Sequence, residues 1–270
     1  MSERQVVVIG AGTMGRGIAM VAVASGISTV LMDVDRRALE RAREQVERHA
    51  PEAARALTTT TVLEQAVGTA SLVVEAVPEL PALKREIFAH LERSAPADAV
   101  LATNTSTIPI AEIARACERP ERVVGLHFFN PVHRMAVVEV ISGERTRASA
   151  TERANAFAVA LGKDPINVRD SPGFVANRLG LLLGNEAMRI VEEGIATPAD
   201  VDKAARLGFG HPMGPLQVAD LVGLDARLNN LRSMHALTGR AELRPPTILE
   251  ELVGEGRLGR KSGRGFYDYG

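Results

Sequence analysis

Short apolar runs alternate with amphipathic, helix-like stretches along the chain up to about residue 170. Such runs favour strands, since they are short and separated by polar turns. They lie at residues 6–9, 29–32, about 58–62, 72–77, 99–102, 123–128 and 137–141. Alternation of strands and helices is typical of a parallel sheet with helices on both faces. The pattern therefore predicts an α/β domain with a doubly wound, Rossmann-type sheet.

The pattern changes near residue 170, and from there to the C-terminus it predicts helices only. Ser171 is suited to cap a long helix that runs to about Glu193, with Pro172 in its first turn. Further helices are predicted from Thr197-Pro198, from Gly214-Pro215, and between Gly223 and Gly239. We therefore expect a sheet domain at 1–170 and an all-α C-terminal domain at 171–270.

The first apolar run leads into a glycine-rich turn that predicts a dinucleotide site. Gly10 permits a tight turn, Gly12 lets the backbone approach a pyrophosphate, and Gly15 lets the next helix pack closely on the strand. Thr13 and Met14 complete the predicted binding segment. We expect the phosphates at the N-terminus of that helix, where backbone N–H groups and the helix dipole attract an anion.

Asp33 ends the second strand at the interval from the glycines at which a carboxylate hydrogen-bonds the adenosine ribose. A 2′-phosphate would meet like charge there, so this residue favours NAD over NADP. Arg36 and Arg37 lie close enough in sequence to keep NADP as an alternative. The sequence thus predicts NAD as the cofactor.

Composition and charge exclude several other classes of function. The chain has 32 Lys and Arg against 33 Asp and Glu, which argues against nucleic acid or an anionic membrane as the main partner. No segment is long and apolar enough to span a bilayer, and no signal-peptide region precedes the first strand, so we expect a cytoplasmic protein. One cysteine, Cys117, and no clustered ligand spacing predict no metal site.

His127 and Glu139 each lie inside an apolar strand, with the turn signal Asn130-Pro131 between them. If the two strands lie side by side, the carboxylate reaches the ring. It would then fix the imidazole tautomer and stabilise the protonated form, as a base that takes a proton from an alcohol requires. The alternative interpretation is a hydrogen-bonded core histidine with no catalytic role.

Several segments occur in an order typical of one known family. They are the glycine turn, 73–77 with Glu79 and Lys84, 103–106, 127–131 with Glu139, 171–178, 211–215 and 259–267. Together they resemble the L-3-hydroxyacyl-CoA dehydrogenase family, including its bacterial 3-hydroxybutyryl-CoA members. The resemblance covers nearly the whole chain. It implies NAD-dependent oxidation of a 3-hydroxyacyl thioester to the 3-oxoacyl thioester, or the reverse reduction.

The resemblance also implies roles for individual residues. His127 would be the general base and Glu139 would orient it. Ser106 and Asn177 would hydrogen-bond the reacting oxygen or the thioester carbonyl, and Asn130 would join them in binding the substrate. Structural alternatives are a helix cap for Ser106 and a helix–helix contact for Asn177.

Three further residues, Glu79, Lys84 and Asn104, would lie along the nicotinamide end of the cofactor by the same resemblance. For Glu79 and Lys84 the alternative is a solvated charge pair.

The chain departs from the family after the second strand. Typical members have a long helical hairpin there that contacts CoA, whereas only one helix fits here, at about 37–54, before the strand at 57–62. The helix carries basic residues that are suited to phosphates of CoA or of an acyl-carrier protein's phosphopantetheine, or that simply pair with neighbouring glutamates: Arg41, Arg43, Arg48 and Arg55. A short 3-hydroxyacyl-CoA is the leading substrate, with a carrier-bound acyl group or a free 3-hydroxyacid as alternatives.

Two expectations concern the protein as a whole. A non-catalytic NAD-binding protein is the alternative from another class, although such a protein has no need of a paired base. The helices after Glu193 have more apolar residues than a small domain can bury, which predicts a homodimer and a second wall for the active-site cleft.

Overall fold

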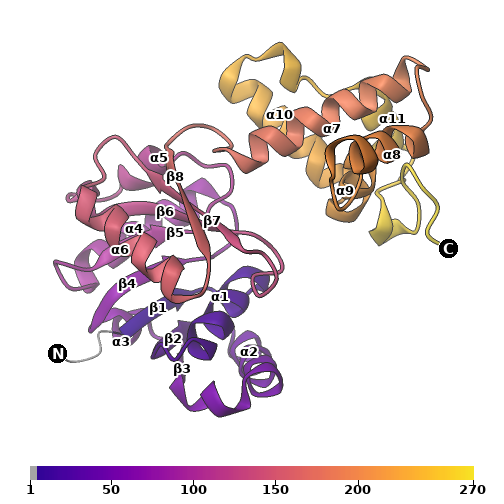
Figure 1. The fold of residues 1–270 in the computed structure, drawn as a ribbon. Helices are drawn as coiled ribbons and strands as arrows, with labels where there is room; N and C mark the ends of the chain where they lie inside the picture. The colour runs from indigo at the N-terminus through magenta and orange to yellow at the C-terminus, as the bar shows by residue number, and fades with distance from the viewer. Residues whose placement is uncertain (1–4) are drawn as a thin grey trace. The chain divides into compact units, whose positions relative to one another are not determined.

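The computed structural model describes residues 5–270, which form two compact units, one up to Phe174 and the other Val175–Gly270 (Figure 1). Each unit is described by itself. In the described part of the chain, no helix has the length and apolar character needed to cross a membrane.

The first unit is built on an eight-stranded sheet in the order β3-β2-β1-β4-β5-β6-β7-β8. The strands are β1 (Gln5–Ile9), β2 (Thr29–Met32), β3 (Leu57–Thr60), β4 (Ala70–Glu75), β5 (Val100–Thr103), β6 (Val123–Phe128), β7 (Val137–Ser142) and β8 (Asp164–Arg169). All neighbours are parallel except β6 and β7, which are antiparallel. The chain runs outward from β1 in both directions, so the strand order reverses between β1 and β4. Ligands of doubly wound sheets bind at such a reversal.

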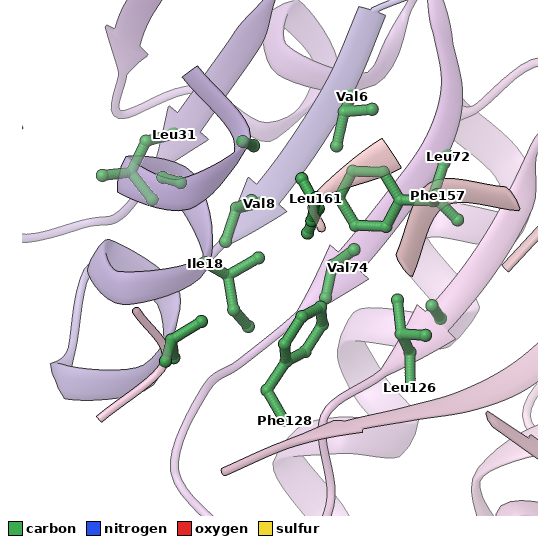
Figure 2. Packing of buried hydrophobic residues seen from close by; sticks show 14 of the residues in the cluster. Val6, Val8, Ile18, Leu31, Leu72, Val74, Leu126, Phe128, Phe157 and Leu161 are labelled. Carbon is green, nitrogen blue, oxygen red and sulfur yellow. The ribbon is translucent and has the colours of Figure 1, made fainter. Parts of the chain in front are cut away.

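Helices cover both faces of this sheet, as the sequence predicts. They are α1 (Thr13–Ala24), α2 (Arg36–His49), α3 (Leu63–Val67), α4 (Pro81–Ser94), α5 (Ile110–Ala114) and α6 (Ala148–Ala160), with short 3-10 segments η1 (Pro51–Ala56) and η2 (Pro120–Arg122). Side chains alternate along β1, so Val6 and Val8 face α1, α2 and α6 while Val7 faces the α3–α5 layer. Figure 2 shows part of the first layer, with Ile18 of α1 close to Val8.

One strand is missing from the sequence prediction, which ends the sheet at 137–141. The structure adds β8, which pairs in parallel with β7 after the crossover helix α6. Its residues are mostly exposed and include Pro165. Proline is tolerated on an edge strand because one side makes no ladder hydrogen bonds. A polar edge strand has no apolar run, and so the pattern does not reveal it.

The segment after β2 contains α2, the 3-10 segment η1 and then β3, so it has a single α-helix as predicted. Asp35 caps α2 by accepting a hydrogen bond from the backbone N–H of Arg37. The helix ends at His49 rather than near residue 54, since Pro51 has no N–H to continue the ladder and starts η1 instead.

The second unit is helical throughout. It contains α7 (Ala176–Glu192), α8 (Pro198–Phe209), α9 (Pro215–Val222), α10 (Leu224–Thr238) and α11 (Thr247–Gly254), with 3-10 segments η3 (Ala241–Leu243) and η4 (Arg260–Ser262). Thr197 caps α8, in agreement with its predicted start. The predicted start of α7 at Ser171 and Pro172 is wrong. Gly173 and Phe174 have positive φ angles of 71° and 49°, which break a right-handed helix, so α7 begins only at Ala176.

Candidate active site

The glycine turn between β1 and α1 has the geometry that an anion requires. Gly10 has a φ of 99°, and a Cβ there would lie 2.8 Å from the carbonyl oxygen of Ala76. A Cβ on Gly15 would overlap the carbonyl of Gly10, so α1 packs directly on the turn. Space is open beside Gly12, which is the N-cap of α1, and no side chain caps this end. Backbone N–H groups at such a terminus suit a diphosphate.

Asp33 lies at the carboxyl end of β2, next to this turn. Its Oδ2 accepts a hydrogen bond from the N–H of Ala11 at 2.6 Å, and its Oδ1 accepts one from the N–H of Asp35 at 2.9 Å. The side chain is half-buried. The carboxylate is therefore fixed beside the glycine turn, where the ribose of a bound dinucleotide would follow the phosphates.

His127 and Glu139 face one another in the register of β6 and β7, which confirms that their strands are neighbours. The Nδ1 of the ring lies 2.7 Å from Oε2 of the carboxylate. Glu139 is fully buried and His127 nearly so. The ring of Phe129 packs 4.5 Å from the imidazole, centroid to centroid, and that of Phe174 5.9 Å from it.

This arrangement decides which nitrogen of the ring is free. An ionised carboxylate only accepts hydrogen bonds, so Nδ1 carries a hydrogen and donates a hydrogen bond to Glu139. The neutral ring then has its lone pair on Nε2, and a proton taken up there gives an imidazolium next to a negative charge. The pair has the chemistry of a general base.

His127 lines a cleft of about 340 Å³ at the carboxyl ends of the strands near the reversal in strand order. The residues that line it are Met14, Ala76, Val77, Glu79, Asn104, Ser106, His127, Phe128, Phe129 and Asn130. The sequence predicted six of these as site residues. Met14 of the glycine turn and His127 thus line the same cleft.

Glu79 organises the loop that follows β5. Its Oε1 accepts hydrogen bonds from the hydroxyl of Thr105 at 2.6 Å, from the N–H of Ser106 at 2.8 Å and from the N–H of Thr107 at 3.1 Å. Burial alone would raise the pKa of this carboxyl, but these bonds and the charge of Lys84 lower it below its ordinary value. Ser106 is therefore held by an ionised carboxylate. It does not cap α5, whose N-cap is Pro109.

Asn104 joins the end of β5 to the end of β6. Its Oδ1 accepts a hydrogen bond from the N–H of Phe128 at 2.9 Å, one residue after His127. Its own N–H donates to the carbonyl of Glu75 in β4 at 2.7 Å. The side chain thus lines the cleft and also fixes the backbone beside the histidine.

Lys84 is not in a solvated charge pair, because its side chain is 1% exposed. Its ammonium lies 2.7 Å from Oε1 of Glu75 and 3.3 Å from Oε2 of Glu79. It does not line the cleft, and its expected position along the cofactor stays a prediction. Sequence reasoning missed Glu75 as the buried partner of this lysine. The signal was available, since Glu75 ends an apolar strand just as Glu139 lies within one.

Lys163 is a second residue that the sequence did not single out. Its ammonium donates to the carbonyl oxygens of Val132 at 2.6 Å and Met135 at 2.8 Å, and partial burial lowers its pKa. It therefore holds the loop between β6 and β7 that carries Asn130. Lys163 directly precedes the unpredicted strand β8, which is why no pattern drew attention to it.

Asn177, the second residue of α7, belongs to the other unit and is half-buried there. Its predicted contact with the substrate stays a prediction.

Comparison with known proteins gives one family over the full length. Residues 5–171 match the 3-hydroxyacyl-CoA dehydrogenase NAD binding domain, and residues 173–269 match the C-terminal domain of the same family. A probable 3-hydroxybutyryl-CoA dehydrogenase of Bacillus subtilis is 42% identical over 100% of this chain and 98% of its own. A 3-hydroxybutyryl-CoA dehydrogenase of Mycobacterium tuberculosis is 41% identical over 98% of both chains.

The solved structures agree with this assignment. The crystal structure of (S)-3-hydroxybutyryl-CoA dehydrogenase from Ralstonia eutropha superposes with a TM-score of 0.95 at 35% identity, and the match covers 100% of both chains. The glycine turn, Asp33 and the cleft are the features that an NAD-binding domain of this kind needs. The chain therefore belongs to the 3-hydroxyacyl-CoA dehydrogenase family and is an NAD-dependent oxidoreductase.

Proposed function

We propose that the protein interconverts a short-chain 3-hydroxyacyl-CoA and the corresponding 3-oxoacyl-CoA. The observation that carries the proposal is the His127–Glu139 pair, a histidine bonded to a buried carboxylate in a cleft that Met14 of the glycine turn also lines. A protein that only binds NAD has no use for such a pair. The names of the relatives, which are 3-hydroxybutyryl-CoA dehydrogenases, support the choice of substrate.

In the oxidation, Nε2 of His127 takes the proton of the substrate hydroxyl. Bound NAD would supply the acceptor for the hydride that leaves C3. The charge of Glu139 stabilises the imidazolium that forms, and in the reduction the same imidazolium returns its proton to the ketone oxygen. Nothing in this scheme requires a metal ion.

The remaining residues bind and orient. Ser106, held by Glu79, donates a hydrogen bond to the reacting oxygen or the thioester carbonyl, and Asn177 does the same from α7. Asn130 contributes to substrate binding at the rim of the cleft, where it is exposed. Asn104, Glu79 and Lys84 would lie at the nicotinamide end of the cofactor.

The test follows NADH absorbance. Purified protein with NAD and (S)-3-hydroxybutyryl-CoA is expected to form NADH, and with NADH and acetoacetyl-CoA to consume it. Free 3-hydroxybutyrate is the control for the thioester and is expected to react poorly, because contacts far from the reacting carbon supply binding energy that orients it. Tight NADH binding without turnover of any 3-hydroxyacyl thioester would instead favour a non-catalytic NAD-binding protein.

A carrier-bound acyl group is the second candidate substrate. The observation that favours it is the single helix α2 with η1, on which Arg41, Arg48 and Arg55 are exposed. An acidic carrier protein would meet this basic surface and gain on-rate through electrostatic attraction. Charge reversal at the three arginines is then expected to lower kcat/KM for the acyl-carrier substrate and to leave acetoacetyl-CoA unaffected. Equal kcat/KM values for the wild type and the charge-reversal variant with both substrates would remove this candidate.

Asp33→Ser is expected to weaken NAD binding and to shift the ratio of kcat/KM values toward NADP. The serine removes the carboxylate that repels a 2′-phosphate, while Arg36 and Arg37 remain nearby. Both constants are measured by NADH or NADPH absorbance with the same thioester. An unchanged ratio would show that another group sets the cofactor preference.

Self-association through the unit Val175–Gly270 is also part of the proposal. Leu207 is 75% and Phe209 79% exposed at the end of α8. Other large apolar side chains on the same unit are exposed as well, namely Leu179, Leu183, Ile195, Leu221, Val222 and Leu237. Apolar surface of this extent favours a partner, here a second copy. Light scattering at micromolar concentration is expected to give twice the mass of a single chain, and a single-chain mass would refute the dimer.

A further inference from the structure

Phe174 has an unusual backbone conformation. Among residues 5–270 it is the one non-glycine residue with a positive φ, at 49°. In this left-handed region the Cβ lies too close to a carbonyl oxygen of the backbone, so a bulky residue is an outlier there. Such residues persist only where the surrounding structure holds them, and they cluster at functional sites. The conformation of Phe174 therefore calls for a functional explanation.

Hydrogen bonds fix the turn that ends at Phe174. The N–H of Asp170 donates to the carbonyl of Ser142 at 2.9 Å, at the end of β7, and its Oδ2 accepts the N–H of Ala111 in α5 at 2.8 Å. The N–H of Phe174 donates to the carbonyl of Ser171 at 3.0 Å and closes the turn. The turn is therefore tied to two elements of the first unit, and the side chain of Phe174 is buried there.

The ring of Phe174 packs on His127 from the core. The two ring centroids are 5.9 Å apart and the ring planes are inclined by 53°, which is a usual geometry for a pair of aromatic rings. Phe129 also packs on the imidazole, but it lines the cleft, whereas Phe174 is not among the residues that line it. Phe174 instead belongs to the buried apolar cluster on the α3–α5 face of the sheet.

A single hydrogen bond does not fix the plane of an imidazole ring. The bond from Nδ1 to Glu139 holds one atom of His127, and the ring can still tilt about it. Tilting moves Nε2, the atom that takes the proton in the proposed reaction. Reacting atoms must lie about 3–3.5 Å apart, and a misplacement of about 1 Å costs about a hundredfold in rate. The base therefore needs a contact that restricts the tilt.

We propose that Phe174 is a positioning residue that fixes the tilt of the His127 ring, and that the left-handed backbone at residue 174 is kept because it brings an aromatic ring to this place. The inference rests on the proposed function, in which Nε2 of His127 takes up the proton. The structural alternative is an aromatic residue that only stabilises the core of the first unit.

The test begins with Phe174→Leu, which stays apolar and removes the flat ring. We expect kcat for acetoacetyl-CoA reduction to fall about ten- to a hundredfold, with little change in KM or in NADH affinity by fluorescence titration. Phe88→Leu is the matched control, since Phe88 on α4 is fully buried in the same cluster and does not line the cleft. Both variants are expected to lose Tm, but only Phe174→Leu to lose kcat.

A double variant shows whether Phe174 acts through the histidine. In a His127→Gln background, Phe174→Leu has no base left to position, so we expect it to cause no further loss of kcat. A residue that only stabilises the fold would lower the fraction of active protein by the same factor in both backgrounds. Equal losses of kcat in the two backgrounds would therefore overturn the inference.

Two more variants separate the aromatic ring from the backbone. Phe174→Gly and Phe174→Ala both remove the ring, but only glycine adopts a positive φ without strain. The glycine variant is expected to have the higher Tm of the two, while kcat is equally low in both. A Phe174→Gly enzyme with normal kcat would show that the ring is not needed, and the inference would be wrong.

The remaining outcomes are distinguishable. If Phe174→Leu does not fold, as judged by circular dichroism, Phe174→Met carries the same comparisons, because methionine fills irregular gaps in a core. A wild type that turns over the thioester while the folded Phe174 variants keep normal kcat overturns the inference alone. A wild type without activity on any 3-hydroxyacyl thioester overturns the proposed function, and the inference with it.

Discussion

His127→Gln is expected to lower kcat on the order of a hundred- to ten-thousandfold, which is the usual contribution of a positioned general base. Glutamine has a similar size but cannot take up a proton at neutral pH. NADH binding is expected to change little, because the ring does not hold the dinucleotide. Steady-state absorbance gives kcat, and fluorescence titration gives the affinity for NADH.

The chain offers a matched control for this variant. His90 on α4 lies with its Nε2 2.9 Å from a carboxylate oxygen of Glu64, so it too is a histidine–glutamate pair, but both side chains are about half exposed. His90→Gln is expected to leave kcat unchanged. A His127→Gln enzyme that kept near-normal turnover would show that another group removes the proton.

Glu139→Gln is expected to lower kcat by up to about ten-thousandfold, the loss found when the carboxylate that orients a catalytic histidine is replaced by its amide. The amide preserves the shape of the side chain but carries no charge to stabilise the imidazolium. The KM for the thioester is expected to change less, since Glu139 is fully buried and acts through His127. Initial rates at several substrate concentrations separate the two constants.

Glu64→Gln, which removes the carboxylate of the exposed pair, is the control for this second variant. The combination His127→Gln/Glu139→Gln is also informative. Residues that act as one unit are not additive, so the double variant should be little worse than His127→Gln alone. Strictly additive losses, or a change in KM with kcat intact, would contradict the proposed role of Glu139.

The sequence predicted contacts well where the residues involved are close together in the chain. The partnership of His127 and Glu139 could be predicted because only the loop 129–136 separates their strands, which makes them neighbours in space. The glycine turn and Asp33 follow from a known spacing for the same reason. Even there, the polar edge strand β8 left no pattern to find.

The contacts of Lys84 could not be predicted in this way. They depend on which parallel strands become neighbours, and β4 lies beside β5 only through a crossover that the local pattern does not fix. In the sequence, Glu75 is predicted near the end of a strand and Glu79 in the loop after it. Neither position indicates a contact with the ammonium. Only the register of Glu75 opposite Thr103 brings the buried network together.

The antiparallel pairing of β6 and β7 determines which sequence changes can separate the histidine from its carboxylate. It places a histidine and its carboxylate 12 positions apart on one continuous stretch of chain. Glu79 and Ser106, by contrast, meet across 27 positions and two parallel strands. An insertion or a recombination point outside 127–139 leaves the acid–base pair whole, whereas one between β4 and β5 separates Glu79 from the serine. The His127–Glu139 pair therefore lies within one short segment, whereas the contact between Glu79 and Ser106 needs both strands and the crossover between them.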